Sequence, residues 1–347
     1  MTHGRTTARR RSSSWAALLA GVAAVLMVAA CAGAAPAPER RPAPASVVTS
    51  ASGFYVDPLT PAAVQVQQWE AAGRSADAAE IRKIAEQPLP LWVTGDAAEA
   101  QAQTRDYVDR AEATGQRPLL VAYNIPHRDC GSFSGGGAPD AAYYRDWVSA
   151  MAAGLGGRPS TVILEPDAVP HELSGCVDGA VRDERYELLS EAVDTLRQAG
   201  ASVYLDAGNP GFISDVDALS GALERSGVRR ADGFSLNVAN FFTVDENAAF
   251  GTAISERLGG ASFVIDTSRN GLGPVTGPEI DGAPSFCNPP GRALGQAPTT
   301  ETGRPLVDAY LWIKRPGESD GACRPGEPAA GQWYPEYALG LARRSVG

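Results

Sequence analysis

Acidic side chains stand just beyond short apolar runs of this sequence. Asp167 lies two residues past the run 161–165, behind a proline that fixes the turn. A carboxyl group placed there, beside apolar side chains and near other carboxylates, has its ionised form disfavoured, so its pKa should rise. A raised pKa is what a general acid requires. Taken alone, an aspartate in this position is more often a helix cap.

The segment 311–321 offers further candidates, since it places a cation and two carboxylates on one loop. Lys314 is one of only two lysines in the chain, and Glu318 and Asp320 follow it closely. The alternative interpretation of these residues is a surface salt bridge on a flexible loop.

Polar side chains gather in the same way where other apolar runs end. A helix cap or a turn explains any one of them, but several runs ending alike indicate a shared site. The residues concerned are Tyr123, Asn124, Glu165, Asp167, Asp206, Asn237, Asn240, Asp266, Lys314, Glu318 and Asp320.

The elements that must position these residues alternate along the chain. Apolar, β-branched or aromatic runs predict buried strands at 91–94, 118–123, 161–165, 202–206, 233–237, 262–266 and 309–314. Apolar residues at helical spacing predict helices at 97–114, 141–155, 183–199, 215–226 and 245–258, each followed by a glycine. This alternation predicts an α/β fold with about seven parallel strands. We expect a single distorted (β/α) barrel of the TIM-like type rather than a doubly wound sheet, because no GxGxxG follows an early strand.

The first 30 residues predict a signal peptide and not part of the fold. Four arginines precede an apolar run that is too short for a convincing transmembrane span, which needs about 20 residues. The run ends in Val28-Ala29-Ala30-Cys31, which resembles a lipobox, so Cys31 is the predicted lipidated residue. A plain cleaved signal peptide is the alternative. Residues 31–52 predict a disordered Ala/Pro tether, and residues 53–347 a single catalytic domain.

Five cysteines are an odd count for an exported protein. Assigning Cys31 to lipid leaves Cys130, Cys176, Cys287 and Cys323, enough for two disulfides in an oxidising compartment. No CxxC occurs among them, so a zinc site is not expected, and neither is any other metal or cofactor.

The net charge of the chain limits the kinds of molecule that it could bind. The formal charge of −10 becomes −14 once the four leader arginines are removed. Such an acidic surface argues against nucleic acid and fits a neutral substrate. We expect a monomer whose only membrane contact is the N-terminal lipid anchor. The protein should therefore lie at the extracellular face of the cell membrane, or else be secreted.

Two catalytic motifs are excluded. His127-Arg128-Asp129 matches part of a protein kinase catalytic loop, but Ser134 replaces the required asparagine, and no Asp-Phe-Gly accompanies it. A serine hydrolase would need His127 or His171 near a nucleophile, and the chain has no GxSxG.

Taken together, the chemistry-bearing segments resemble glycoside hydrolase family 6, the family of inverting endoglucanases and cellobiohydrolases. The resemblance covers nearly the whole mature chain in order, including its four remaining cysteines. The matching segments are 54–56, 123–137, 165–167, 204–208, 237–241, 265–271 and 311–321.

The resemblance implies a role for each matched residue. Asp167 matches the general acid and Asp320 the carboxylate proposed as base. Asp129 matches an aspartate that governs proton transfer and the hydrolytic water, Tyr123 a tyrosine that favours a distorted sugar ring, and Asp206 an acid that tunes Asp167. The sugar-binding positions are matched by Trp92, Asn240, Arg292, Lys314 and Glu318. The family's disulfides imply the pairs Cys130–Cys176 and Cys287–Cys323.

The chain also departs from the family pattern. Asn209 and Phe212 stand where histidine and tryptophan are usual, and Phe286 replaces a tryptophan, so we expect Phe212 to bind sugar with less stacking area and the chain to grip long glucan more weakly. Ser134 lies beside Gly135, which implies that a water-positioning serine is shifted by one position.

Mode of attack follows from loop length. Only 35 residues separate Cys287 from Cys323, where cellobiohydrolases carry insertions that roof the cleft. We therefore expect an open groove and internal cleavage of β-1,4-glucan with inversion, and no cellulose-binding module. The alternatives are an exo-acting cellobiohydrolase and a surface lipoprotein that binds glycan without cutting it.

Overall fold

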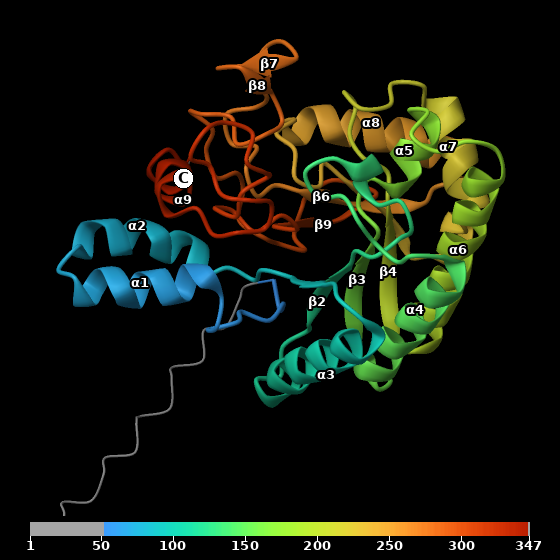
Figure 1. Cartoon of the computed structure of the whole chain (residues 1–347), viewed down its shortest axis with the longest axis horizontal. Coiled ribbons are helices and arrows are strands. Elements are labelled where there is room, and N and C mark those ends of the chain that lie inside the picture. The colour runs from blue at the N-terminus through green and yellow to red at the C-terminus, as the bar shows by residue number, and fades with distance from the viewer. Residues whose placement is uncertain (1–51, 346–347) are drawn as a thin grey trace, which may run out of the picture. The chain divides into compact units, whose positions relative to one another are not determined.

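The computed structural model describes residues 52–345, so the predicted signal peptide, Cys31 and nearly all of the predicted tether lie outside the described residues. One parallel sheet of seven strands organises the described part of the chain, in the order β1-β2-β3-β4-β5-β6-β9 (Figure 1). The strands are β1 (Leu91–Val93), β2 (Leu119–Ala122), β3 (Ser160–Leu164), β4 (Ala201–Asp206), β5 (Gly233–Leu236), β6 (Ser262–Asp266) and β9 (Val307–Leu311). The predicted fold class is confirmed.

Helices connect successive strands of the sheet. They are α3 (Ala97–Ala113), α4 (Ala141–Leu155), α5 (Ala168–Leu173), α6 (Gly179–Gln198), α7 (Val216–Arg225) and α8 (Val244–Arg257), with the short 3-10 turns η1 (Asp129–Gly131) and η2 (Val228–Arg230). Local sequence sets several of their starts. Asp96 and Thr243 form capping boxes with Glu99 and Glu246 at the beginnings of α3 and α8.

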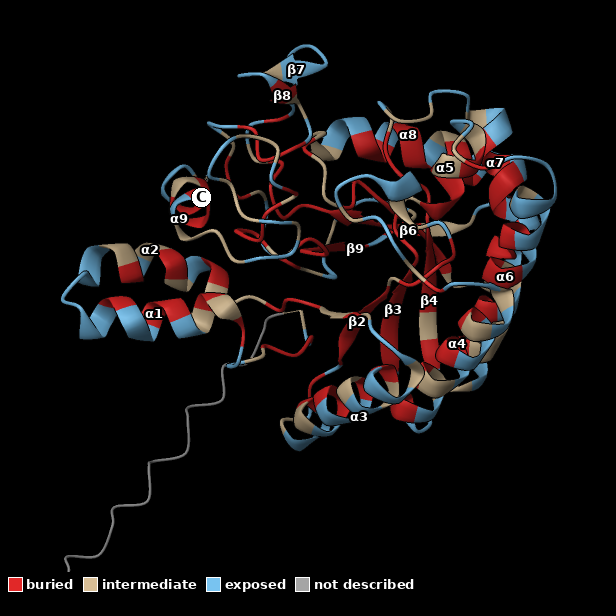
Figure 2. Cartoon of the chain, in the orientation of Figure 1, coloured by how far each residue is buried: buried red, intermediate tan, exposed pale blue. Residues whose placement is uncertain are grey.

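Both faces of the sheet are buried, which explains why its strands read as continuous apolar runs. Along β2 and β3, Leu120, Val162 and Leu164 pack toward the helices, whereas Val121 and Ile163 belong to the cluster inside the curled sheet. Figure 2 shows mostly buried residues in the strands of the seven-stranded sheet, and helices that are buried on one side and exposed on the other. This two-sided core fixes the strand ends that carry the polar residues.

The edges of the sheet, β1 and β9, meet through a side chain. The indole N–H of Trp92 in β1 donates to the carbonyl of Ile313, just beyond β9, at 2.9 Å. Helices α1 (Pro61–Ala71), α2 (Ser75–Ala85) and α9 (Pro335–Arg343) share a core with Trp312 from the same segment. The barrel is thus open in its backbone pairing and joined at this seam by side chains.

The last strand differs from the prediction of 309–314. It begins at Val307 and ends at Leu311, because its partner β6 ends at Asp266, which pairs with Leu311. Lys314 therefore belongs to the loop beyond the strand, free to point across the barrel mouth. A small hairpin of β7 (Glu279–Ile280) and β8 (Ala283–Pro284) lies between β6 and β9 in the chain. Within residues 52–345, none of the helices has the length and apolar character that crossing a bilayer demands.

Candidate active site

The loops that follow the carboxyl ends of the strands enclose a cleft of about 1250 Å³. Nine of the predicted site residues line it together, from loops after β2, β3, β4, β5 and β9 and from β1 itself. They are Trp92, Tyr123, Asp129, Asp167, Phe212, Asn240, Lys314, Glu318 and Asp320. The carboxyl-terminal mouth of a barrel of this kind is where catalytic groups converge.

The backbone around the cleft is strained. Of the ten non-glycine residues with positive φ among residues 52–345, seven lie in the loops after β2, β3 and β5. Those seven are His127, Asp129, Cys130, Glu165, Asp167, Asn237 and Ala239. Such conformations cost on the order of 1–3 kcal/mol each and persist where the surroundings enforce them, typically at functional sites.

Asp167 is held at the start of α5, with φ of 68°, by the carboxylate of Asp206. Burial raises the pKa of Asp167 well above its usual range, and the charges of Asp206 and Asp129 raise it further. Asp167 lines the cleft, whereas Asp206 is fully buried below it. The surroundings of Asp167 therefore favour its protonated form over its ionised form.

Asp206 ends β4 and forms hydrogen bonds in three directions. Its carboxylate accepts the backbone N–H groups of Asp167 at 2.9 Å and Gly208 at 3.1 Å, and the hydroxyl of Ser235 at 2.9 Å. Burial raises its pKa to about 6, although these hydrogen bonds favour the ionised form. Asp206 is thus a second buried acid that shares the site of Asp167 without reaching the cleft.

Asp129 and Tyr123 face the cleft from the loop after β2. The Asp129 carboxylate accepts the backbone N–H of Ser134 at 2.7 Å, which folds the serine-rich loop back over η1. The Tyr123 ring lies edge-on to Trp92 with its centroid 5.1 Å away, and the Arg128 guanidinium lies 4.4 Å from the Tyr123 centroid. Burial raises the pKa of the Tyr123 hydroxyl, as do the charges of Asp167 and Asp129, so this side chain stays neutral.

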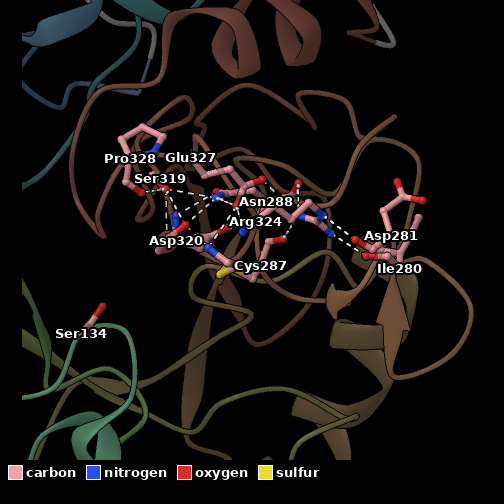
Figure 3. The surroundings of a disulfide bond; sticks show 12 residues. Ser134, Ile280, Asp281, Cys287, Asn288, Ser319, Asp320, Arg324, Glu327 and Pro328 are labelled. Atoms are coloured by element: carbon pink, nitrogen blue, oxygen red, sulfur yellow. Dashed lines mark hydrogen bonds and ion pairs between the residues drawn. A yellow bond between two sulfur atoms is a disulfide. The ribbon is translucent and has the colours of Figure 1, made fainter.

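Asp320 is surrounded by donors. Arg269 lies 2.7 Å from one of its oxygens and the Lys314 ammonium 3.3 Å from the other, and the backbone N–H of Asn288 donates at 2.9 Å. Burial alone would raise the pKa of Asp320, but Arg269 and Lys314 outweigh it and hold the pKa below its ordinary value. Figure 3 shows Asn288 beside Asp320, next to Cys287. The ionised form of Asp320 is therefore favoured in the same cleft in which the protonated form of Asp167 is favoured.

Arg269 is the main residue of the site that sequence reasoning did not assign. It is 0% exposed, donates to the carbonyl of Ala239 and lies over the Phe241 ring, 4.4 Å from its centroid. Arg269 stands in a polar stretch after β6, and the sequence pattern of this stretch is that of an ordinary loop. A buried arginine is identified by its partners in space, and no spacing in the sequence indicates them.

Lys314 and Glu318 are also buried in the wall of the cleft, at 8% and 5% exposure. Burial lowers the pKa of Lys314 and raises that of Glu318. Glu318 is paired with Arg315 at 2.9 Å, and Arg315 lines the cleft as well. The pairings leave Lys314 beside Asp320 and Glu318 beside Arg315.

Arg292 does not line the cleft. Its guanidinium donates to the carbonyls of Leu272 and Gly273, at 3.3 and 2.7 Å. It supports the loop that leads to the β7–β8 hairpin, so sugar binding by Arg292 stays a prediction that this geometry does not support. Phe212 does line the cleft and packs edge-on against His171.

The two disulfides, Cys130–Cys176 and Cys287–Cys323, have the pairing that the resemblance implied. Cys130 joins the loop after β2 to the segment after α5, and Cys287 joins the segment after β8 to the loop after Asp320. Two groups among residues 52–345 have metal-ligand spacing, but each contains one of these disulfides, with His171 or Glu327. Sulfur in a disulfide is not the thiolate that binds a metal.

The comparisons with known proteins agree with this geometry. The family model described as "Glycosyl hydrolases family 6" matches residues 49–345. Endoglucanase A of Cellulomonas fimi is 47% identical over 85% of this chain, which spans 62% of that protein's length. Endoglucanase 1 of Streptomyces halstedii is 40% identical, with 85% of this chain and 89% of that protein covered.

A solved structure is similar over nearly all of its length. The endoglucanase Cel6 of Mycobacterium tuberculosis, in complex with methyl-cellobiosyl-4-deoxy-4-thio-β-D-cellobioside, has a TM-score of 0.78 and 43% identity, with 86% of this chain and 99% of that one covered. The match of a family model to almost the entire described chain, and the identity of these relatives, lead to one conclusion. The chain belongs to glycosyl hydrolase family 6.

Proposed function

We propose that this chain hydrolyses β-1,4-glucosidic bonds of cellulose or a related β-glucan, by internal cleavage and with inversion of anomeric configuration. The proposal depends on one observation: Asp167 and Asp320 line the same cleft and their pKa values are displaced in opposite directions. Carboxyl groups whose surroundings push their pKa values apart are suited to act as an acid and a base. Membership in the family supports the reaction class.

Asp167 acts as the general acid in this proposal. Protonation of the glycosidic oxygen requires a carboxyl group that still carries its proton near neutral pH. Burial and the neighbouring carboxylates of Asp206 and Asp129 favour that state. After the proton has left, the backbone N–H bond from Asp167 to Asp206 keeps the side chain in place for the next turnover.

Asp320 is the proposed base, which activates the attacking water. Its ionised form is favoured by Arg269 and Lys314. Inversion needs two carboxyl groups about 6.5–9.5 Å apart, with room for water on the far side of the sugar. Asp167 follows β3 and Asp320 follows β9, which are not neighbours in the sheet, so the two groups come from different walls of the cleft. Asp129 directs the water and Tyr123 crowds the sugar at the cleavage point.

A neutral glucan suits the lining of the cleft. Aromatic rings stack on the apolar faces of glucose, and Trp92, Phe212 and Phe286 all line the cleft. Internal cleavage is supported by two relatives that are named endoglucanases. The short connection between Cys287 and Cys323, in which β9 is the one helix or strand described, also supports it.

We also propose that the protein is exported and tethered to the membrane by lipid on Cys31. The lipobox-like sequence supports this, and two disulfides fit an oxidising compartment. Cys31→Ala should release the protein from membrane fractions, because the tether is then lost. Unchanged partitioning of the variant would remove the lipid anchor from the proposal.

Product analysis tests the proposed reaction. The purified domain is incubated with carboxymethyl cellulose and barley β-glucan, and viscosity and reducing ends are followed together. An endo-acting enzyme lowers viscosity long before many reducing ends appear. An exo-acting enzyme releases many reducing ends while the viscosity is still high. Proton NMR of cello-oligosaccharide products should show the α-anomer first. A β-anomer would refute inversion, and binding without any products would indicate a non-catalytic glycan-binding protein.

A further inference from the structure

Asp266, the last residue of β6, is a buried carboxylate without a role in the proposed reaction. It is 0% exposed and does not line the cleft. Its oxygens accept three backbone N–H groups, from Ser268 at 2.9 Å, Ala239 at 3.1 Å and Lys314 at 2.9 Å. These groups belong to the loops that follow β6, β5 and β9, so one side chain connects three walls of the barrel mouth.

Each of these N–H groups belongs to a residue that is itself a cation in contact with Asp320, or that binds or directly precedes such a cation. Lys314 is held through its backbone by Asp266 and places its ammonium 3.3 Å from Asp320. Ala239 is held through its N–H, and its carbonyl accepts the guanidinium of Arg269. Ser268 precedes Arg269 directly. Both cations that keep Asp320 ionised are therefore anchored through Asp266.

The conformation of these loops needs such an anchor. Ala239 has a φ of 58°, which is unfavourable for a residue with a Cβ, and no glycine relieves it. A buried carboxylate that accepts several backbone N–H groups is well satisfied, whereas a neutral replacement would leave buried donors unpaired. Replacing Asp266 should therefore destabilise the conformation of these three loops.

We infer that Asp266 is a positioning residue for Asp320, acting through the loops that carry Lys314 and Arg269. The inference rests on the proposed function, in which Asp320 is the base. Asp266 does not touch substrate. It sets the distances between Asp320 and its two cations, and by this route the pH below which the base becomes protonated.

The charges around the two aspartates determine in which direction the pKa of Asp320 should shift when Asp266 is changed. Asp320 faces Arg269, Lys314 and the hydroxyl of Tyr337 on α9, and Glu318 lies beyond Lys314; Asp266 faces Asp206 and Arg269. Removing the negative charge of Asp266 would by itself favour ionised Asp320 and lower its pKa. Moving Lys314 and Arg269 away from Asp320 would raise it. The direction of the shift separates an effect of charge from an effect of position.

The test compares Asp266→Asn with the wild type in the pH dependence of kcat/KM on a soluble cello-oligosaccharide. An amide has only one acceptor oxygen and turns its NH₂ group toward a backbone donor, so at least one loop is released. We expect the acidic limb to move up by about half a pH unit or more, which is about threefold in the ratio of ionised to protonated base. Asp232→Asn is the matched control, since Asp232 also accepts a strand N–H, that of Val203 at 2.9 Å, at the opposite end of the sheet.

A second variant separates position from charge and carries the test if Asp266→Asn does not fold. Asp266→Glu keeps the negative charge but displaces the oxygens by one methylene, so the acidic limb should again move up. An acidic limb that stays or moves down in both variants, with only the stability lowered, would overturn the inference. Failure of the proposed function is distinguishable, because it would appear as a wild type without activity or as an Asp320→Asn variant that keeps full activity.

Discussion

The backbone N–H of Asp167 donates to the buried carboxylate of Asp206 at 2.9 Å. The acid that ends β4 therefore holds the loop that carries the acid following β3. The same carboxylate raises the pKa of Asp167, after the larger effect of burial. One contact thus sets both where Asp167 lies and how strongly it keeps its proton.

Asp167→Asn should lower kcat on unactivated glucan by about 10²–10⁴-fold, because an amide cannot donate the proton that the leaving oxygen needs. An aryl cellobioside with a good leaving group should lose much less, since it departs without protonation. Asp140→Asn serves as a control. That residue only caps α4, by accepting the N–H of Tyr143, so its loss should affect stability and not the rate. Near-wild-type turnover of glucan by Asp167→Asn would show that the acid is misassigned.

Asp206→Asn should move the basic limb of the activity profile to lower pH. Removing a negative charge next to Asp167 lowers the pKa of Asp167, so the acid loses its proton earlier as the pH rises. The measurement is kcat/KM from about pH 5 to 9 on a soluble oligosaccharide. A basic limb that stays in place or moves to higher pH would contradict this coupling.

Much of this architecture could be predicted from the sequence. Continuous apolar runs predicted the strands because both faces of a parallel sheet are buried. Helices ended where expected, since Gly115, Gly156, Gly200, Gly227 and Gly259 all have positive φ after or at a helix end. Asp167 and Asp320 were found because polar residues after barrel strands converge on one face. The family resemblance added the individual roles and the disulfide pairing.

What the sequence did not indicate depends on contacts across the barrel mouth. Arg269 and Asn288 hold Asp320, yet both stand in loops whose local pattern is that of ordinary turns. The sequence also did not indicate that the guanidinium of Arg292 donates to the carbonyls of Leu272 and Gly273, and sugar binding by Arg292 stays a prediction. The direction of a long side chain is set by its partners in space, which periodicity and spacing do not record.

Removing the Cys287–Cys323 disulfide by a Cys→Ser pair should lower the free energy of unfolding by about 4 kcal/mol, from the entropy of a loop of this length. Activity should fall as well, because the neighbouring Asn288 donates its N–H to Asp320. Denaturant titration and kcat measured on the same sample check both effects. The Cys130–Cys176 pair closes a loop of 46 residues and is a control of similar entropy. A variant as stable as the wild type would contradict the entropic estimate.

Glu172→Gln should stabilise the fold, increasingly so as the pH rises. Burial raises the pKa of Glu172 to about 8, so the folded protein holds a proton that the unfolded chain gives up above its ordinary pKa. Stability is therefore lost between the two pKa values as the pH increases, by on the order of a few kcal/mol in total. The glutamine, which does not titrate, removes this loss. Melting temperatures measured at pH 4 and pH 8 should agree at the lower pH and differ at the higher one; equal values at both would contradict the burial argument.

Substitutions at Phe286 test substrate binding directly, because this residue is 49% exposed and lines the cleft next to the β7–β8 hairpin. Phe286→Trp enlarges the surface available for stacking on a glucose ring and should lower KM for long oligosaccharides, whereas Phe286→Ala should raise it. Aromatic contacts contribute about 0.5–1.5 kcal/mol, so each change should be about two- to tenfold. Leu59→Ala, which is more exposed and lies outside the cleft, should leave KM unchanged. If Phe286 acts only by binding sugar, kcat should stay constant in all three variants. A change in kcat with constant KM would mean that this ring shapes the catalytic loops and does not bind sugar.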